Sequence, residues 1–117
     1  MCDKPADPRY QEILKLDKLL TEAGIPHCTE RKLDGWHIQY PVAGGLVICS
    51  IVEFTGSYGH RHDRLEIQGL LNKAERKYDT VVGFLSAEKV FDRIKADWER
   101  RKKRAGHQEV ELPNRSV

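Results

Sequence analysis

A polar stretch directly after the most apolar run of the chain holds the residues best suited to chemistry. Residues 56–64 read GSYGHRHDR and combine glycines, a tyrosine, histidines and arginines. Glycines permit backbone angles that turn successive amides toward one concave point, and arginines hold phosphate through paired hydrogen bonds. A tyrosine ring offers a stacking face for a base. The stretch predicts an anion-binding or nucleotide-binding loop, whose candidate residues are Gly56, Ser57, Tyr58, Gly59, His60, Arg61 and Arg64.

The same stretch has a plainer interpretation as a polar connection between strands. Its arginines could pair with the nearby carboxylates Glu53, Asp63 and Glu66 instead of a ligand. The glycine spacing matches neither the phosphate-binding P-loop nor the dinucleotide-binding fingerprint. A ligand site and a polar connection therefore both stay open on the sequence.

A metal site is a secondary hypothesis for this loop. His60 and His62 are two residues apart, so their rings would point the same way in an extended segment, and Asp63 could add a carboxylate. Arg61 and Arg64 lie beside them, and their positive charge opposes a cation. A metal-dependent hydrolase using these residues remains an alternative function, and no cofactor is predicted.

Two side chains near the histidines could act as nucleophiles. Ser57 lies in TGSYG, which lacks the first glycine of the G-x-S-x-G elbow. Cys49 lies inside an apolar strand pattern, where an inert buried thiol is expected. Neither residue favours nucleophilic catalysis, and the residues alone leave open whether the chain is an enzyme.

Length and composition bound the class of protein. The chain has 117 residues, of which 39% are hydrophobic and 32% charged, which fits one soluble domain. Its three cysteines form no CxxC pair, and their odd number argues against a disulfide framework. No segment resembles a signal peptide or a membrane span, so a cytoplasmic protein without a membrane partner is expected.

A basic run lies near the end of the chain. Residues 100–104 read RRKKR, although the formal net charge of the whole chain is only +2. The run makes a nucleic-acid contact possible, but it has no interleaved aromatic residues. Cations at the end of a helix also complement the helix dipole, so nucleic acid is not the favoured partner.

The candidate loop needs a scaffold, and the patterns on both sides of it predict one. Asp7-Pro8 starts a helix over about 8–23, and Asp34-Gly35 marks a hairpin. The apolar run 46–54 is typical of a central strand buried on both faces. Residues 65–71 fit either a strand or a helical turn, and residues 80–85 could form a fourth strand.

Ser86 caps a second helix, which is expected to reach about Lys103. The predicted fold is α+β, with an antiparallel sheet of three to four strands, an N-terminal helix and a long C-terminal helix packed on it. We expect a single domain over residues 1–104 and a disordered tail over 105–117.

The order of several short segments resembles that of small uncharacterised proteins encoded by phages and prophages of Gram-positive gut bacteria. The resemblance covers roughly residues 10–98 and rests on EAGIP, the DG hairpin, SYG, LEIQGLL and VVGFLSAEKVFDRIK. It implies a phage accessory protein in the cytoplasm of the host cell. It carries no catalytic or ligand-binding residues across.

Small phage proteins without a catalytic motif often act by binding, which is an analogy at the level of the class. We therefore expect an anti-defence binding protein, most concretely one that sequesters an anionic nucleotide-type signal. One short loop cannot bury a nucleotide, so a homo-oligomer is implied. The alternative partner is a host defence enzyme, inhibited by direct protein–protein contact.

Overall fold

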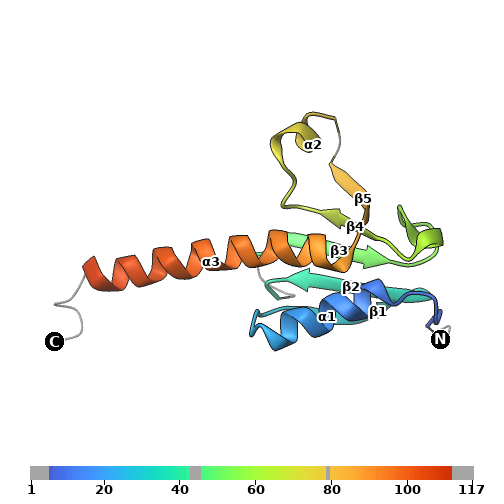
Figure 1. Cartoon of the computed structure of the whole chain (residues 1–117), viewed down its shortest axis with the longest axis horizontal. Coiled ribbons are helices and arrows are strands. Elements are labelled where there is room, and N and C mark those ends of the chain that lie inside the picture. The colour runs from blue at the N-terminus through green and yellow to red at the C-terminus, as the bar shows by residue number, and fades with distance from the viewer. Residues whose placement is uncertain (1–5, 43–45, 79, 112–117) are drawn as a thin grey trace.

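The computed structural model describes residues 6–42, 46–78 and 80–111. Helix α1 (Glu12–Glu22) precedes strands β1 (Cys28–Lys32), β2 (Gly35–Tyr40) and β3 (Cys49–Glu53). A short 3-10 helix, η1 (His60–His62), then leads into strand β4 (Leu65–Gln68). Helix α2 (Lys73–Tyr78), strand β5 (Val81–Leu85) and helix α3 (Ala87–Glu111) complete the chain (Figure 1). The α+β class predicted from the sequence is confirmed.

The sheet contains five strands, where the sequence predicted three to four. The strands follow one another in chain order, and every neighbouring pair is antiparallel. The difference arises because both ambiguous segments are strands: residues 65–68 form β4, and residues 81–85 form β5 beside it. The candidate loop is therefore the connection between β3 and β4.

The first hairpin turns one residue earlier than the Asp-Gly signal indicates. Lys32 pairs with Gly35, so the two residues of the turn are Leu33 and Asp34. A Cβ atom on Gly35 would lie only 1.8 Å from the Glu53 carbonyl oxygen. Gly35 is thus needed where β2 passes β3, and the left-handed φ of 53° falls on Leu33.

Both long helices cover the same face of the sheet. The core gathers Ile13, Leu16 and Leu20 of α1, Val90 and Ile94 of α3, and the inward residues of the strands, which include Ile38, Tyr40, Cys49, Ile51, Leu65 and Ile67. The outward residues of β3, Ser50 and Val52, are only partly buried. The prediction that this strand is buried on both faces is therefore wrong, because the core residues of α1 and α3 pack with its inward residues, Cys49 and Ile51.

Helix α1 begins later than Asp7-Pro8 predicts. The Asp7 carboxylate binds Arg9, accepting hydrogen bonds from its amide at 2.9 Å and from its guanidinium at 2.7 Å. The first amides of the helix, those of Gln11 and Glu12, instead donate to Asp63 Oδ1 at 2.9 Å. The β3–β4 connection therefore supplies the cap of α1.

Helix α3 begins where the sequence predicts, with the amide of Lys89 donating to Ser86 Oγ at 3.3 Å. The helix continues to Glu111, past the expected end near Lys103, and Figure 1 shows it running well beyond the sheet. The remainder of the expected tail, residues 112–117, lies outside the described residues. None of the helices in the described part of the chain has the length and apolar character of a membrane-spanning segment.

Candidate functional site

The β3–β4 connection forms a pocket of about 290 Å³. Most of the candidate ligand-binding residues line it. The full lining is Gly56, Ser57, Tyr58, Gly59, His60, Arg61, His62 and Phe84. Phe84 comes from β5, and no local pattern in the sequence indicates that this strand would meet the loop. Arg64 is the one predicted ligand residue that is not part of the lining.

Close contact with β5 sets the shape of the loop. Gly56 and Gly59 have φ of 104° and 100°, the left-handed values that the sequence reasoning expected of these glycines. A Cβ on Gly83 would lie 2.2 Å from Tyr58 Cβ, so only glycine lets the loop lie against the strand there. The amide of Phe84 donates to the Tyr58 carbonyl at 3.4 Å, which closes the contact.

Exposed aromatic rings form part of the pocket wall. Tyr58 is 56% exposed and Phe84 is 61% exposed. The His62 ring lies 6.3 Å from the Phe84 ring, centroid to centroid. Phe84 also has a φ of 62°, which is rare for a bulky residue and clusters at functional sites when it occurs. Large exposed rings around one hollow are typical of a surface that meets a partner molecule.

A second hollow of about 430 Å³ adjoins the first. It is lined by Tyr58, Ala74, Glu75, Val81, Val82, Gly83 and Phe84. Tyr58 and Phe84 belong to both hollows, so the two form one surface that changes from cationic to apolar. A ligand with an anionic end and a flat apolar end would match this change.

The cations of the loop point in different directions. Arg61 is exposed and lines the pocket, and its guanidinium makes no hydrogen bond or ion pair within the described residues. Arg64 instead donates to the carbonyl oxygens of His62 and Asp63, at 3.4 and 3.0 Å. Arg61 is therefore the arginine available to an anion in the pocket.

The backbone amides of the loop are less available to an anion than the glycine pattern predicts. The amide of Tyr58 donates to Glu66 Oε1 at 2.8 Å, so a carboxylate of the protein already occupies it. The amides of Ser57 and His60 donate to the carbonyls of Phe54 and Ser57. These three amides do not converge on the pocket, so side chains would have to hold an anion there.

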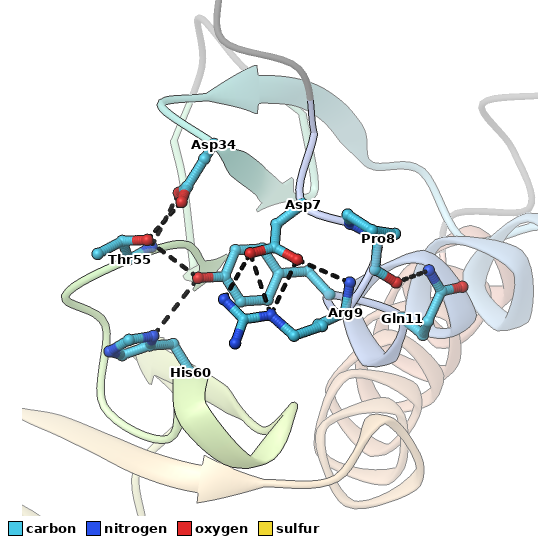
Figure 2. A network of polar contacts seen from close by, with 8 residues as sticks. Asp7, Pro8, Arg9, Gln11, Asp34, Thr55 and His60 are labelled. Carbon is cyan, nitrogen blue, oxygen red and sulfur yellow. Dashed lines mark hydrogen bonds and ion pairs between the residues drawn. The ribbon is translucent and has the colours of Figure 1, made fainter.

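His60 is held in place by a chain of polar contacts (Figure 2). Its Nδ1 lies 3.4 Å from the hydroxyl of Tyr10, which lies 3.2 Å from Thr55 Oγ1. The Thr55 hydroxyl and amide both donate to the Asp34 carboxylate. Because Tyr10 is fully buried, the network fixes His60 at the inner side of the pocket.

The carboxyl groups of Glu53 and Asp63 are both engaged in holding the start of α1. Glu53 is fully buried and accepts a hydrogen bond from the Ile13 amide at 3.3 Å. Burial, with the nearby Asp63 carboxyl adding to it, raises the pKa of Glu53 to about 9. Glu53 is therefore protonated at neutral pH, while Asp63 serves as the cap of α1.

The metal-site and nucleophile hypotheses receive no support from the arrangement of these side chains. Among the side chains that the structure describes, those of residues 6–42, 46–77 and 80–104, no group of three His, Cys, Asp or Glu could hold a metal ion. Ser57 Oγ donates to the Phe54 carbonyl at 2.8 Å, so its hydroxyl closes a turn. Burial raises the pKa of the Cys49 thiol to about 12, which makes it inert as a nucleophile.

Comparison of the chain with family models, curated proteins and solved structures found no match.

Proposed function

We propose that this protein is a phage accessory protein that binds an anionic, nucleotide-type small molecule at the β3–β4 pocket and sequesters it from a host defence system. The observation that carries the proposal is the Arg61 guanidinium, which has no partner in the described part of the chain and lines a pocket with two exposed aromatic rings. The phage context rests on the resemblance of the sequence segments alone.

The chemistry of the pocket supports this ligand class. Arg61 can hold a phosphate through two parallel hydrogen bonds, and His60 and His62 add further nitrogen donors when they are protonated. Tyr58 and Phe84 offer faces for a base, because stacking on aromatic rings tolerates any base. The Glu66 carboxylate at the Tyr58 amide lowers the affinity of the site for anions and makes a tightly held multiple phosphate less favourable.

The volume of the β3–β4 pocket indicates that one copy of the chain does not enclose a whole nucleotide. A volume of about 290 Å³ is at the lower end of ligand pockets, which run from about 300 to 1,000 Å³. A nucleotide therefore extends into the neighbouring apolar hollow, and we expect a second copy of the chain to cover the side that remains open. Native mass spectrometry of the freshly purified protein measures the oligomer and any retained small molecule together.

The two arginines provide a matched pair of variants. We expect the affinity for a bound nucleotide to fall at least tenfold in Arg61→Ala, which corresponds to about 1.4 kcal/mol. Arg64→Ala should bind like the parent, because this side chain turns to backbone carbonyls and away from the pocket. Calorimetric titration with AMP, ATP and cyclic di-AMP measures both.

Equal binding by the parent and Arg61→Ala would show that the pocket is not the anion site. Loss of binding in both variants, with folding intact by circular dichroism, would favour a diffuse electrostatic contact over a defined site.

Direct inhibition of a host protein is the second candidate function. Residues 99–104 of α3 are all exposed, and this part of the helix extends beyond the sheet (Figure 1). Short helical segments without tertiary packing are marginal in water, so a partner that packs on this half of α3 would stabilise it. Co-purification from host lysate of a stoichiometric protein, with no nucleotide retained, would favour this function over the first.

A further inference from the structure

Three polar side chains meet on the open face of the sheet, away from the β3–β4 pocket. Glu30 of β1 and His37 of β2 are direct cross-strand partners, and Ser50 of β3 is diagonal to His37. His37 Nδ1 lies 3.3 Å from Glu30 Oε2, and His37 Nε2 lies 2.6 Å from Ser50 Oγ. The three groups form a continuous serine–histidine–carboxylate chain.

The carboxylate determines which nitrogen of His37 carries the proton. An ionised Glu30 can only accept a hydrogen bond, so a neutral His37 must carry its proton on Nδ1. The Nε2 atom then has a free lone pair, and the Ser50 hydroxyl donates to it. A hydroxyl paired with an imidazole, which is oriented in turn by a carboxylate, is the general arrangement of an activated serine nucleophile.

The surroundings leave this group accessible. Both long helices contact the other face of the sheet, and Ser50 and His37 are each partly exposed. Ser50 pairs with Gln39 on one side and with Gln68 on the other. Direct cross-strand partners lie on the same face of a sheet, so Gln39 and Gln68 stand on either side of Ser50 on the open face. Their carboxamide N–H groups are hydrogen-bond donors of the kind that stabilise a developing oxyanion.

We propose that Glu30, His37 and Ser50 form an acyl-transfer site, with Ser50 as nucleophile and His37 as general base, acting on esters presented to the open face of the sheet. Ser50 Oγ bonds to the ester carbonyl carbon while its proton moves to His37 Nε2. The carbon–oxygen bond to the leaving group then breaks, and His37 returns the proton to the alcohol that departs. Water releases the acyl group from Ser50 by the same steps, so no other reactant is needed.

A fluorophosphonate probe tests the nucleophile on the intact chain. Attack by Ser50 expels fluoride and leaves a covalent phosphonyl group, which peptide mass spectrometry locates. We expect labelling at Ser50, and a fall in its rate of about 10² to 10⁴-fold in His37→Gln. The buried-turn serine, Ser57, serves as an internal control and should stay unlabelled. Hydrolysis of 4-nitrophenyl acetate should fall in parallel and should be lost in Ser50→Ala.

Glu30 acts through His37 and is a positioning residue, so its test needs a different readout. In the ¹⁵N spectrum of the imidazole, the parent should show His37 as one tautomer with the proton on Nδ1. Glu30→Ala should give a mixture of both tautomers and slower labelling of Ser50.

The outcomes separate a reactive group from a structural one. Labelling at Ser50 that depends on His37 supports the acyl-transfer site. Parent protein that remains unlabelled at Ser50, or labelling that is unchanged in His37→Gln, would mean that the three residues are only a cross-strand polar ladder. Nucleotide binding at the β3–β4 pocket is unaffected by either result.

Discussion

Replacing Glu53 with glutamine should change how the stability of the fold depends on pH. Glu53 is the last residue of β3 and is fully buried beneath the start of α1. Burial is the main cause that raises its pKa to about 9, and the Asp63 carboxyl adds to the shift. In the unfolded chain the same group has an ordinary pKa of about 4.3.

The sign of the effect follows from proton binding. Between these two pKa values the folded protein holds a proton that the unfolded chain has released, so the free energy of unfolding falls as pH rises. The slope is about 1.4 kcal/mol per pH unit, or about 2.7 kcal/mol between pH 6 and pH 8. The stabilising contribution is complete below about pH 4 and is lost above about pH 9.

Urea unfolding at pH 6, 7 and 8 measures this slope. Glu53→Gln keeps an oxygen for the Ile13 amide and cannot ionise, so its free energy of unfolding should lack the contribution from this group. Relative to the variant, the parent should therefore lose about 2.7 kcal/mol over this range. Glu99→Gln, a neutralised carboxyl at an exposed position of α3, is the matched control and should follow the parent. Parallel curves for the parent and Glu53→Gln would instead mean that Glu53 is already ionised in the folded protein.

Substitutions at three further positions, Asp63, Gly83 and Tyr40, test contacts that hold the fold together. Asp63→Ala removes the acceptor for two amides of α1 and should lower the free energy of unfolding by about 1 to 2 kcal/mol in urea, whereas Asp63→Asn should lose less because its oxygen can still cap the helix. Gly83→Ala places a methyl group 2.2 Å from Tyr58 Cβ and should lower the free energy of unfolding by about 1 to 3 kcal/mol. The amide NMR signals of residues 56–62 should shift in this variant. An unchanged spectrum of the loop would contradict the close contact. Tyr40→Phe removes a buried hydroxyl that donates to Asp97 Oδ2 at 2.7 Å and should cost about 1.5 to 3 kcal/mol in chemical denaturation, and full stability in this variant would rule the bond out as a significant contributor.

Local patterns predicted most of the scaffold. Ser86 starts α3 because its hydroxyl accepts a hydrogen bond from an amide of the first turn. This contact joins residues that are close in sequence, so a local pattern predicts it. The helical stripe with Val90 and Ile94 is buried as its spacing indicates. The number of strands was harder, because residues 65–71 fit two periodicities and only pairing with β3 and β5 selects the strand.

The composition of the candidate site depends on contacts that local patterns do not encode. Six of the seven predicted ligand residues line the pocket because they are consecutive in one loop. Phe84 joins them only through the packing of Gly83 on Tyr58. Arg61 and Arg64 look equivalent in sequence, yet Asp63 between them has a φ of 53° and Arg64 turns to backbone carbonyls.

The group on the open face was missed for a similar reason. Ser50 lies in an apolar run, whereas Ser57 and Cys49 are the candidate nucleophiles closest in sequence to the histidines of the loop. The contact between Ser50 and His37 needs the register of β2 on β3, and the contact with Glu30 needs that of β1 on β2. Alternation along 49–53 could have placed Ser50 outward, but only the paired strands bring it to His37.

An NMR titration of the ¹⁵N-labelled parent protein with AMP, ATP and cyclic di-AMP tests the proposed binding function most directly. We expect saturable amide shifts that concentrate on residues 56–62 and 83–84, with much weaker shifts in Arg61→Ala. Shifts that centre on the basic residues 100–104 of α3, or the absence of saturable shifts in the β3–β4 pocket with every nucleotide, would contradict it.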